Sequence, residues 1–231
     1  MDIDGTLMNG GATIAGVADS IFKIMTDESK KILFYTNGGY CTLERTWQKV
    51  VAWLREQLDA ERFAVIEPLL TKSLFYNTAQ LTAKYLRSKL SDQDKVLCFG
   101  NEGLNEEIVA AGLRSEVLKP MLAGETEYSP QMSDVQFGAY EIDPEVKAIA
   151  KGVCQFFDQR KLAVASLYLQ IPETLFVVTN DDPVFVAGRN GRLYPDVGAT
   201  LASLETACGR KAFSVGKPND FALKVMLEDH F

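Results

Sequence analysis

Short apolar runs that end in polar, glycine-containing loops alternate with helical patterns along this 231-residue sequence. KILFYT (31–36) predicts a buried strand that leads directly into Asn-Gly-Gly. Apolar residues recur at helical spacing over 45–58 and again over 75–86, with the strand-like run FAVI (63–66) between them. Because strands that alternate with helices usually form a parallel sheet, we expect an α/β fold.

The middle of the chain repeats this alternation. KVLCFG (95–100) and TLFVVTN (174–180) predict strands, and a helix is expected to begin near Gly103. Three more elements are expected between them: a helix over 145–157 and strand-like runs at 135–140 (VQFGAY) and 163–168 (AVASLY). These elements predict a second α/β unit.

Toward the C-terminus, a helix is expected over 199–207 with Gly209 as its stop. A short strand in KAFSVGKP (211–218) and a last helix from Asn219 follow. The sequence contains no internal repeat, low-complexity tract or flexible linker. A domain inserted into a split first domain therefore fits the sequence better than domains joined by linkers.

Charge and composition exclude several classes of function. Lysine and arginine number 24 against 31 acids, a net charge of -7, so nucleic acid and anionic membranes are poor partners. No apolar run approaches the roughly 18 residues of a membrane span and no export signal is visible, so we expect a cytoplasmic location. His230 is the one histidine, which excludes Ser-His-Asp triads and histidine metal sites. The dispersed cysteines are interpreted as buried free thiols: Cys41, Cys98, Cys154 and Cys208.

The opening stretch MDIDGTL places Asp2 and Asp4 two residues apart in front of Gly5. Side chains two apart in an extended segment point the same way, so both carboxylates can reach one substrate, and Gly5 permits a sharp turn after them. One carboxylate can attack phosphorus to form an aspartyl-phosphate, while the other protonates the leaving oxygen and later activates water. The pair therefore favours phosphoryl chemistry.

Two other predicted strand ends carry groups that suit a phosphate. Thr36 offers a hydroxyl donor. Asn37, Gly38 and Gly39 offer amides on an open loop. A phosphate beside a carboxylate meets a repulsion of about 4 kcal/mol per charge pair at about 4 Å, with an effective dielectric of about 20, and Lys217 and Mg2+ can offset it. Because reactive groups collect at the carboxyl ends of strands in open α/β sheets, we expect these segments to meet at one site.

Each motif alone is weak evidence. D-x-D-G-T is compatible with a turn bearing solvated acids, T-N-G-G with an ordinary strand end, and G-K-P with a loop. A nucleotide-binding P-loop at Lys217 is excluded, because Lys211 stands where that motif requires glycine and Pro218 where it requires Ser or Thr.

Taken in this order, each at a strand end, the motifs resemble those of the haloacid-dehalogenase-type phosphatases: D-x-D-G-T/V, a Thr or Ser that ends a strand, and a lysine. The sequence is similar to the branch that contains phosphoglycolate phosphatase, p-nitrophenyl phosphatase, pyridoxal phosphatase and the bacterial NagD protein. The similar segments are Thr36-Asn37, KVLCFGNEGLNEEIVAAGL, FVVTNDD, YPDVGATLASLE and GRKAFSVGKP.

This resemblance implies a Mg2+-dependent phosphatase that hydrolyses a small phosphorylated metabolite of the phosphoglycolate or p-nitrophenyl phosphate type. Asp2 would be the nucleophile, Asp4 the acid and base, and Lys217 the catalytic cation. Mg2+ would be held by the Asp2 carboxylate and the Asp4 carbonyl. The residues implied to bind the phosphoryl group are Thr36, Asn37, Gly38 and Lys217.

The resemblance also implies a domain arrangement. A doubly wound parallel-sheet, Rossmann-like core would occupy 1–93 and 191–231, with an α/β cap domain inserted at 94–190. The cap of this branch closes over the leaving group, and whether caps pair into a homodimer is left open. Candidates for substrate selection, which could equally form a polar turn before Pro183, are Thr179, Asn180, Asp181 and Asp182.

The sequence departs from the family pattern at both ends. Family members carry an apolar strand before the first aspartate, where only Met1 stands, and a G-D-x-x-x-x-D motif after the lysine, where Asp229 lacks the glycine and the strand. Mg2+ prefers six oxygen ligands, and Asp2 and the Asp4 carbonyl provide two of them, so weak metal binding is expected. We therefore expect a piece of a longer phosphatase whose present form hydrolyses p-nitrophenyl phosphate feebly or not at all. The alternatives are a non-catalytic phosphate- or metabolite-binding module, and an enzyme that uses another acceptor than water, as in phosphotransferases or protein-directed phosphatases.

Overall fold

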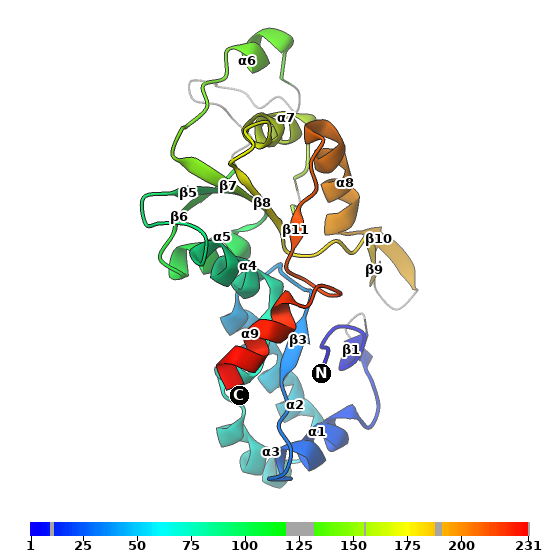
Figure 1. Ribbon diagram of the computed structural model, residues 1–231. Helices are drawn as coiled ribbons and strands as arrows, with labels where there is room; N and C mark the ends of the chain where they lie inside the picture. The colour runs from blue at the N-terminus through cyan, green and yellow to red at the C-terminus, as the bar shows by residue number, and fades with distance from the viewer. Residues whose placement is uncertain (10–11, 119–131, 155, 188–190, 231) are drawn as a thin grey trace.

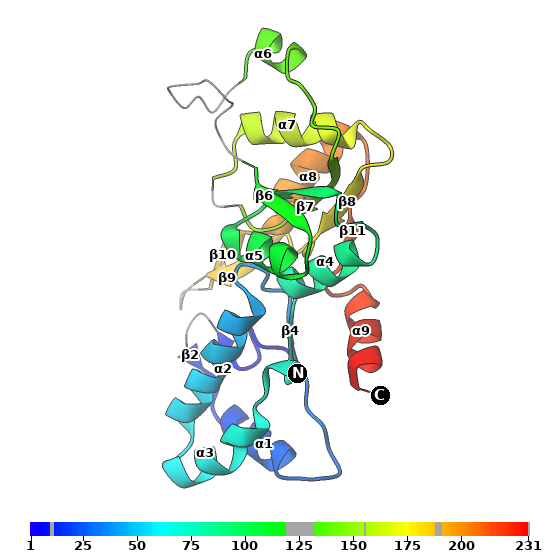
Figure 2. The ribbon, with the colours of Figure 1, turned by 90° about the vertical axis from the view of Figure 1, so that its left-hand side faces the viewer.

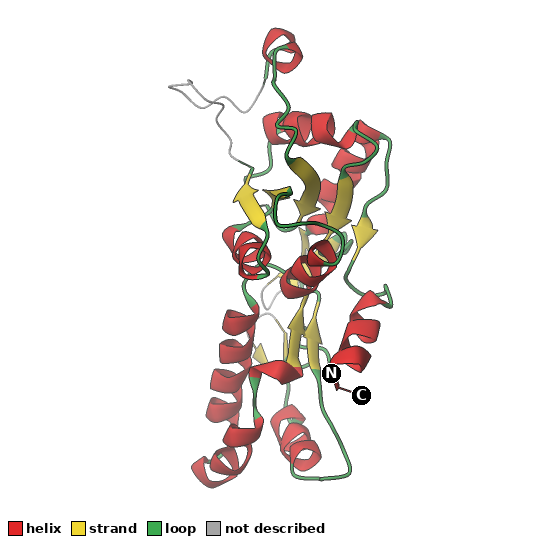
Figure 3. Ribbon diagram, turned by 60° about the vertical axis from the view of Figure 1, so that its left-hand side comes forward, coloured by secondary structure: helices red, strands yellow, loops and turns green. Residues whose placement is uncertain are grey.

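The computed structural model of the protein describes residues 1–9, 12–118, 132–154, 156–187 and 191–230. It shows an elongated molecule in which two parallel sheets follow one another along the long axis (Figure 1). The smaller sheet pairs β3 (Phe34–Thr36) with β4 (Phe75–Asn77), seen in yellow in Figure 3. The elements packed around it are β1 (Met8–Asn9), β2 (Ala12–Thr13), α1 (Val17–Met25), α2 (Leu43–Gln57), α3 (Ala60–Ile66) and the 3-10 turns η1 (Glu67–Leu69) and η2 (Lys72–Leu74).

The first residues of the chain extend this smaller sheet. The Met1 amino group donates to the Leu33 carbonyl at 2.6 Å, and the Tyr35 N–H donates to the Met1 carbonyl at 2.8 Å. Asp2 forms a parallel bridge with Tyr35. The chain then turns at Gly5, whose φ of +85° is a conformation that favours glycine. The opening carboxylates therefore lie beside the carboxyl end of β3.

The larger sheet has five parallel strands in the order β11-β8-β7-β5-β6. Helices α4 and α5 cover one face and α7 and α8 the other, which gives three layers (Figures 1 and 2). The bounds are β5 (Lys95–Phe99), β6 (Arg114–Val117), β7 (Val146–Lys151), β8 (Leu175–Val178), β11 (Phe213–Ser214), α4 (Thr78–Arg87), α5 (Glu102–Ala110), α7 (Gln159–Leu169) and α8 (Val197–Cys208). The remaining elements are α6 (Asp134–Gly138), α9 (Phe221–His230) and the antiparallel hairpin of β9 (Val184–Ala187) and β10 (Arg192–Pro195).

Strand β5 shows why this sheet is buried on both faces. Val96 and Cys98 pack into the cluster under α4 and α5, whereas Leu97 and Phe99 pack into the cluster under α7 and α8. All four are at most 5% exposed. Alternate residues of a strand point to opposite faces, so an unbroken apolar run such as VLCF requires helices on both sides.

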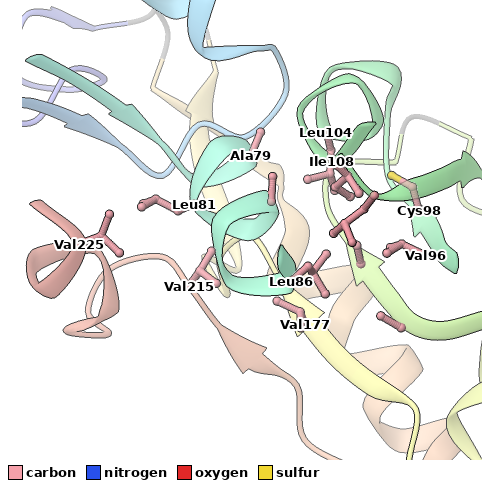
Figure 4. Packing of buried hydrophobic residues seen from close by; sticks show 14 of the residues in the cluster. Ala79, Leu81, Leu86, Val96, Cys98, Leu104, Ile108, Val177, Val215 and Val225 are labelled. Atoms are coloured by element: carbon pink, nitrogen blue, oxygen red, sulfur yellow. The ribbon is translucent and has the colours of Figure 1, made fainter. Parts of the chain in front are cut away.

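Helix α4 joins the two sheets. It begins directly after β4, where the Asn77 side chain caps it by accepting the Gln80 N–H at 2.9 Å. Figure 4 shows Leu81 and Leu86 of this helix in one apolar cluster with Val177 of β8 and residues of α5 and α9. One core therefore connects the N-terminal sheet, the five-stranded sheet and the C-terminal helix.

The α/β class, the strands at KILFYT, KVLCFG, TLFVVTN and KAFSVGKP, and the helices near 45–58, 103, 199–207 and 219 are confirmed. Gly209 ends α8 with a φ of +69°, as expected. Other expectations are wrong. FAVI and AVASLY lie in α3 and α7, and 75–77 forms β4 rather than the start of a helix. Short apolar runs do not distinguish a buried strand from a buried helix.

The expected strand at 135–140 and the expected helix over 145–157 are also wrong. VQFGAY lies largely in α6, which begins with a capping box between Ser133 and Gln136 that the hydrophobic pattern does not reveal. Instead of the helix expected over 145–157, residues 146–151 form strand β7, a central strand that is buried on both faces except at Lys147 and so lacks a clear period of two.

The predicted domain boundaries stay a prediction. The five-stranded sheet takes β5, β7 and β8 from the segment assigned to the cap and β11 from the segment assigned to the core. The boundary at Asn190 lies outside the described residues. Within the described ranges, no helix is both long and apolar enough to cross a membrane.

A buried lysine at the end of β7 is the least expected feature of this core. The side chain of Lys151 is fully buried, and its Nζ donates to the Gly152 carbonyl at 2.5 Å and lies 5.2 Å from the centre of the Phe99 ring. Burial lowers the pKa of Lys151 from 10.5 to about 8. The protein therefore holds a charge in a desolvated position at neutral pH.

We predict that Lys151→Met stabilises the protein near neutral pH. A fall in pKa from 10.5 to about 8 corresponds to a cost of about 3 kcal/mol while the lysine is charged. Between these two values the unfolded chain binds more protons than the folded one, so the stability of the wild type rises with pH and the advantage of the variant shrinks. Urea unfolding at about pH 7 and about pH 10 measures this, with the exposed Lys147→Met on the same strand as control. Equal effects of Lys151→Met at both pH values would contradict it.

Candidate active site

The two aspartates at the start of the chain each contact one of the other predicted motifs. Lys217 Nζ lies 2.5 Å from Asp2 Oδ1, and Thr36 Oγ1 donates to Asp4 Oδ2 over 2.8 Å. Ile3 between them is 1% exposed, so it anchors the segment while the residues on either side face the site. Three segments that are far apart in the sequence therefore meet at one place.

Thr36 ends β3 and fixes the loop that follows. Besides donating to Asp4, its hydroxyl accepts the Gly38 N–H at 2.9 Å. From the other side, Thr78 Oγ1 in the first turn of α4 donates to the Asn37 carbonyl at 2.8 Å. A Cβ at Gly39 would lie 2.7 Å from Thr78 Oγ1, so a side chain there would separate the loop from α4. The loop backbone is held from both sides.

The Asn37 side chain joins this loop to the lysine loop. Its Oδ1 accepts the Lys217 N–H at 2.8 Å, and its Nδ2 donates to the Lys217 carbonyl at 3.2 Å. The same Nδ2 donates to Asp182 Oδ2 at 2.8 Å, which also accepts from Asn180 Nδ2 at 2.8 Å. The acceptor and both donors of this amide therefore have protein partners, and Asn37 sets the position of the Lys217 backbone relative to Thr36.

Gly216 allows the lysine loop to approach the end of β8. A Cβ at this position would lie 2.7 Å from the Thr179 carbonyl oxygen, 2.9 Å from Asn180 Cβ and 3.0 Å from Asn37 Oδ1. Two of these three atoms belong to side chains already used in the hydrogen-bond network around Asn37. A glycine is therefore required for the contacts that bring Lys217 to Asp2.

A second lysine stands beside the second aspartate. Lys49, on α2, has its Nζ 3.4 Å from Asp4 Oδ1 and donates to the Tyr40 hydroxyl at 3.2 Å. Burial by itself lowers the pKa of Lys49, but the Asp4 carboxylate and the Tyr40 hydroxyl outweigh it, so the pKa is raised and the group is charged at neutral pH. Lys217 Nζ lies 5.1 Å from the centre of the Tyr35 ring. Each carboxylate thus faces its own cation.

The structure brings together all the residues that the sequence predicts for the site. They are Asp2, Asp4, Thr36, Asn37, Gly38 and Lys217. Among the candidates for substrate selection, Asn180 and Asp182 contact the Asn37 network. The sequence does not predict Lys49 and its neighbour Tyr40 at the site. The apolar spacing of 45–58 locates the buried face of α2 but not the neighbours of a polar side chain on it.

Comparison with known proteins shows which family this chain belongs to. A model of haloacid dehalogenase-like hydrolases matches residues 1–114. Chronophin from Bos taurus is 31% identical over 100% of this chain and 68% of its own length. 4-Nitrophenylphosphatase from Schizosaccharomyces pombe is 28% identical over 98% of this chain and 70% of its own length. The chain belongs to the haloacid dehalogenase-like hydrolases.

A solved structure confirms the fold of this haloacid dehalogenase-like chain. Glycerol phosphate phosphatase from Mycobacterium tuberculosis, in complex with magnesium, aligns with a TM-score of 0.70 at 23% identity. The alignment covers 98% of this chain but 56% of that protein. The expected family and its Rossmann-like parallel-sheet architecture are confirmed, and the chain spans about two thirds of the curated relatives and little more than half of this neighbour.

The opening aspartates offer part of the donor set that a magnesium ion needs. The Asp2 carboxylate and the Asp4 carbonyl are the hard oxygen donors that Mg2+ prefers, so they fit the ion in kind. No group of three or more His, Cys, Asp or Glu side chains is arranged as metal ligands in the part of the chain that is described. Asp229, the acid compared with the expected fourth motif, instead accepts from Tyr76 and Lys84 at 2.9 Å and 2.5 Å. With two oxygens from the protein, most of the six coordination positions of Mg2+ are left to phosphate and water.

We predict that Gly216→Ala destabilises the protein and separates Lys217 from Asp2. The added methyl must displace the end of β8 or the Asn37 side chain, a change that typically costs about 1–3 kcal/mol. Urea unfolding measures the loss, and Gly138→Ala is the control because nothing lies within 4 Å of a Cβ at that position. A Gly216→Ala protein as stable as the wild type would show that the contacts around Gly216 are not needed.

Proposed function

We propose that this chain is a phosphomonoester hydrolase that acts on a small phosphorylated metabolite through an aspartyl-phosphate at Asp2. The observation that carries the proposal is the pairing of both carboxylates with the other motifs, Asp2 with Lys217 at 2.5 Å and Asp4 with Thr36 at 2.8 Å. The phosphatases among its relatives support the same reaction class. Pairing into a homodimer through the cap stays a prediction.

In the first half of the reaction, an oxygen of the Asp2 carboxylate attacks phosphorus and the bond from phosphorus to the ester oxygen breaks. Asp4 donates its proton to that departing oxygen. In the second half, Asp4 takes a proton from a water that attacks the aspartyl-phosphate, which releases inorganic phosphate and restores Asp2. One carboxylate changes its bonding while the other moves the proton, which is why the site needs both.

The remaining residues hold the phosphoryl group and offset its charge. The ammonium of Lys217 reduces the repulsion between phosphate and Asp2, which amounts to about 4 kcal/mol per charge pair at about 4 Å with an effective dielectric of about 20. Thr36 and the backbone amides of Asn37 and Gly38 bind the phosphoryl oxygens, for which the Thr36 hydroxyl must leave Asp4 and the Gly38 N–H must leave Thr36. Mg2+, held by the Asp2 carboxylate and the Asp4 carbonyl, would neutralise further charge when bound.

A second candidate function is a phosphate- or metabolite-binding module without catalysis. The small number of acidic metal ligands among the described residues favours it. This module would keep the loops that carry Thr36, Asn37 and Lys217 and bind phosphate without turning it over. The two candidates differ in whether Asp2 is needed as a nucleophile.

We predict slow, Mg2+-dependent hydrolysis of p-nitrophenyl phosphate that Asp2→Asn abolishes, because an amide is not a nucleophile toward phosphorus. Release of p-nitrophenol is measured with Mg2+ and after its removal by a chelator. Asp229→Asn is the control, since Asp229 contacts Tyr76 and Lys84 rather than the site. Phosphate binding without any release of p-nitrophenol would favour the binding module, and turnover that survives Asp2→Asn would refute the nucleophile.

A further inference from the structure

The ring of Tyr35 lies beside the Lys217 ammonium, a contact that the reaction above does not use. Lys217 Nζ lies 5.1 Å from the centre of this ring and 2.5 Å from Asp2 Oδ1. A lysine ammonium within about 6 Å of the centre of an aromatic ring is attracted by the negative charge on the face of that ring. The ammonium is therefore held by a carboxylate and by a ring at the same time.

Strand β3 fixes the position of this ring. Successive side chains of the strand point to opposite faces, so Phe34 packs into the core under α1, α2 and α3, whereas Tyr35 packs against the cluster shown in Figure 4. On one edge the Tyr35 N–H donates to the Met1 carbonyl at 2.8 Å, and on the other edge Tyr35 pairs with Tyr76 of β4. The backbone that carries the ring is thus held from both sides.

The long side chain of Lys217 is where such a contact matters. Asn37 fixes the Lys217 backbone through two hydrogen bonds, but a flexible four-carbon chain separates that backbone from the ammonium. The side chain of Lys217 is 40% exposed, so other protein atoms do not enclose it. The Tyr35 ring restricts the ammonium to the side of Asp2.

A neutral ring suits this role better than a second carboxylate would. It attracts the cation but carries no net charge, so it adds nothing to the repulsion that an incoming phosphate meets at Asp2. Burial raises the pKa of the Tyr35 hydroxyl, and the smaller opposing effect of the Lys217 backbone does not cancel this rise, so the side chain stays neutral. The contact with the ring also persists when Asp2 bonds to phosphorus and is no longer a free carboxylate.

We infer that Tyr35 is a positioning residue that holds the Lys217 ammonium against Asp2 through the face of its ring. The inference rests on the proposed function in one respect, because it takes Lys217 to be the cation that meets the phosphoryl group. Without the ring, the ammonium samples more positions in solvent, and the site binds a phosphate less tightly.

Calorimetric binding of inorganic phosphate in Mg2+ tests the inference without requiring turnover. We expect Tyr35→Leu, which removes the ring, to weaken phosphate binding at least about fivefold. Tyr35→Phe should retain the affinity of the wild type, because it keeps the ring and removes a hydroxyl that makes no hydrogen bond of sound geometry within the described residues. Tyr76→Leu is the matched control, since it removes the paired tyrosine of β4, whose ring instead lies 5.9 Å from Lys84 Nζ.

A double-mutant cycle separates positioning from general damage to the fold. In Lys217→Met protein, Tyr35→Leu should have no further effect on phosphate affinity, because the ring acts through the ammonium. Pentafluorophenylalanine in place of Tyr35 keeps the shape of phenylalanine but removes the negative charge of the ring face, so it should weaken phosphate binding as Tyr35→Leu does. This variant keeps the test decisive where urea unfolding shows that Tyr35→Leu does not fold.

Unchanged phosphate affinity in Tyr35→Leu, or an equal loss with and without the Lys217 ammonium, would overturn the inference. Wild-type affinity in the protein that carries pentafluorophenylalanine would also overturn it, because the charge of the ring face would then have no role. These outcomes are separate from the fate of the proposed function, which depends on whether the protein with Asp2 and Tyr35 intact releases p-nitrophenol from p-nitrophenyl phosphate.

Discussion

The contact between the Lys217 ammonium and the Asp2 carboxylate is the interaction on which the rest of the site depends. It joins residues 215 positions apart in the sequence across 2.5 Å. In the proposed reaction the Asp2 carboxylate attacks a negatively charged phosphate, and a cation beside it offsets a repulsion of about 4 kcal/mol per charge pair at about 4 Å and an effective dielectric of about 20. The fold can be understood as the framework that makes this contact.

That framework is a series of short-range contacts between loops at the carboxyl ends of strands. Asp2 itself pairs with Tyr35 of β3, Thr36 ends β3, and Lys217 follows β11. The Asn37 amide bridges the last two loops with two hydrogen bonds to the Lys217 backbone, and Asp182 holds that amide from the end of β8. β3 belongs to the two-stranded sheet and β8 and β11 to the five-stranded sheet, so these hydrogen bonds tie together loops of two different sheets, and a shift in any one loop is constrained by the others.

Much of this site could be predicted from the sequence because its chemistry is carried by short motifs at strand ends. D-x-D-G-T, T-N-G-G and G-K-P name residues that the structure then brings into contact. The fold was harder to predict where buried elements show no clear alternation of apolar and polar residues. Strand β7 is buried on both faces, and helix α7 contains the strand-like run AVASLY. The position of Lys49 beside Asp4 and Tyr40 could not be predicted, because it depends on how α2 packs against the opening loop, which the spacing of residues within α2 does not encode.

The most direct test of the account is to locate the phosphoryl group in a trapped intermediate. In Asp4→Asn protein, p-nitrophenolate should still depart from p-nitrophenyl phosphate with little help from an acid, while water attack on the aspartyl-phosphate slows for want of a base. Acid quenching followed by peptide mass spectrometry would then find one phosphoryl group on Asp2. A phosphoryl group on another residue would contradict the account, as would release of p-nitrophenol with no covalent adduct at Asp2.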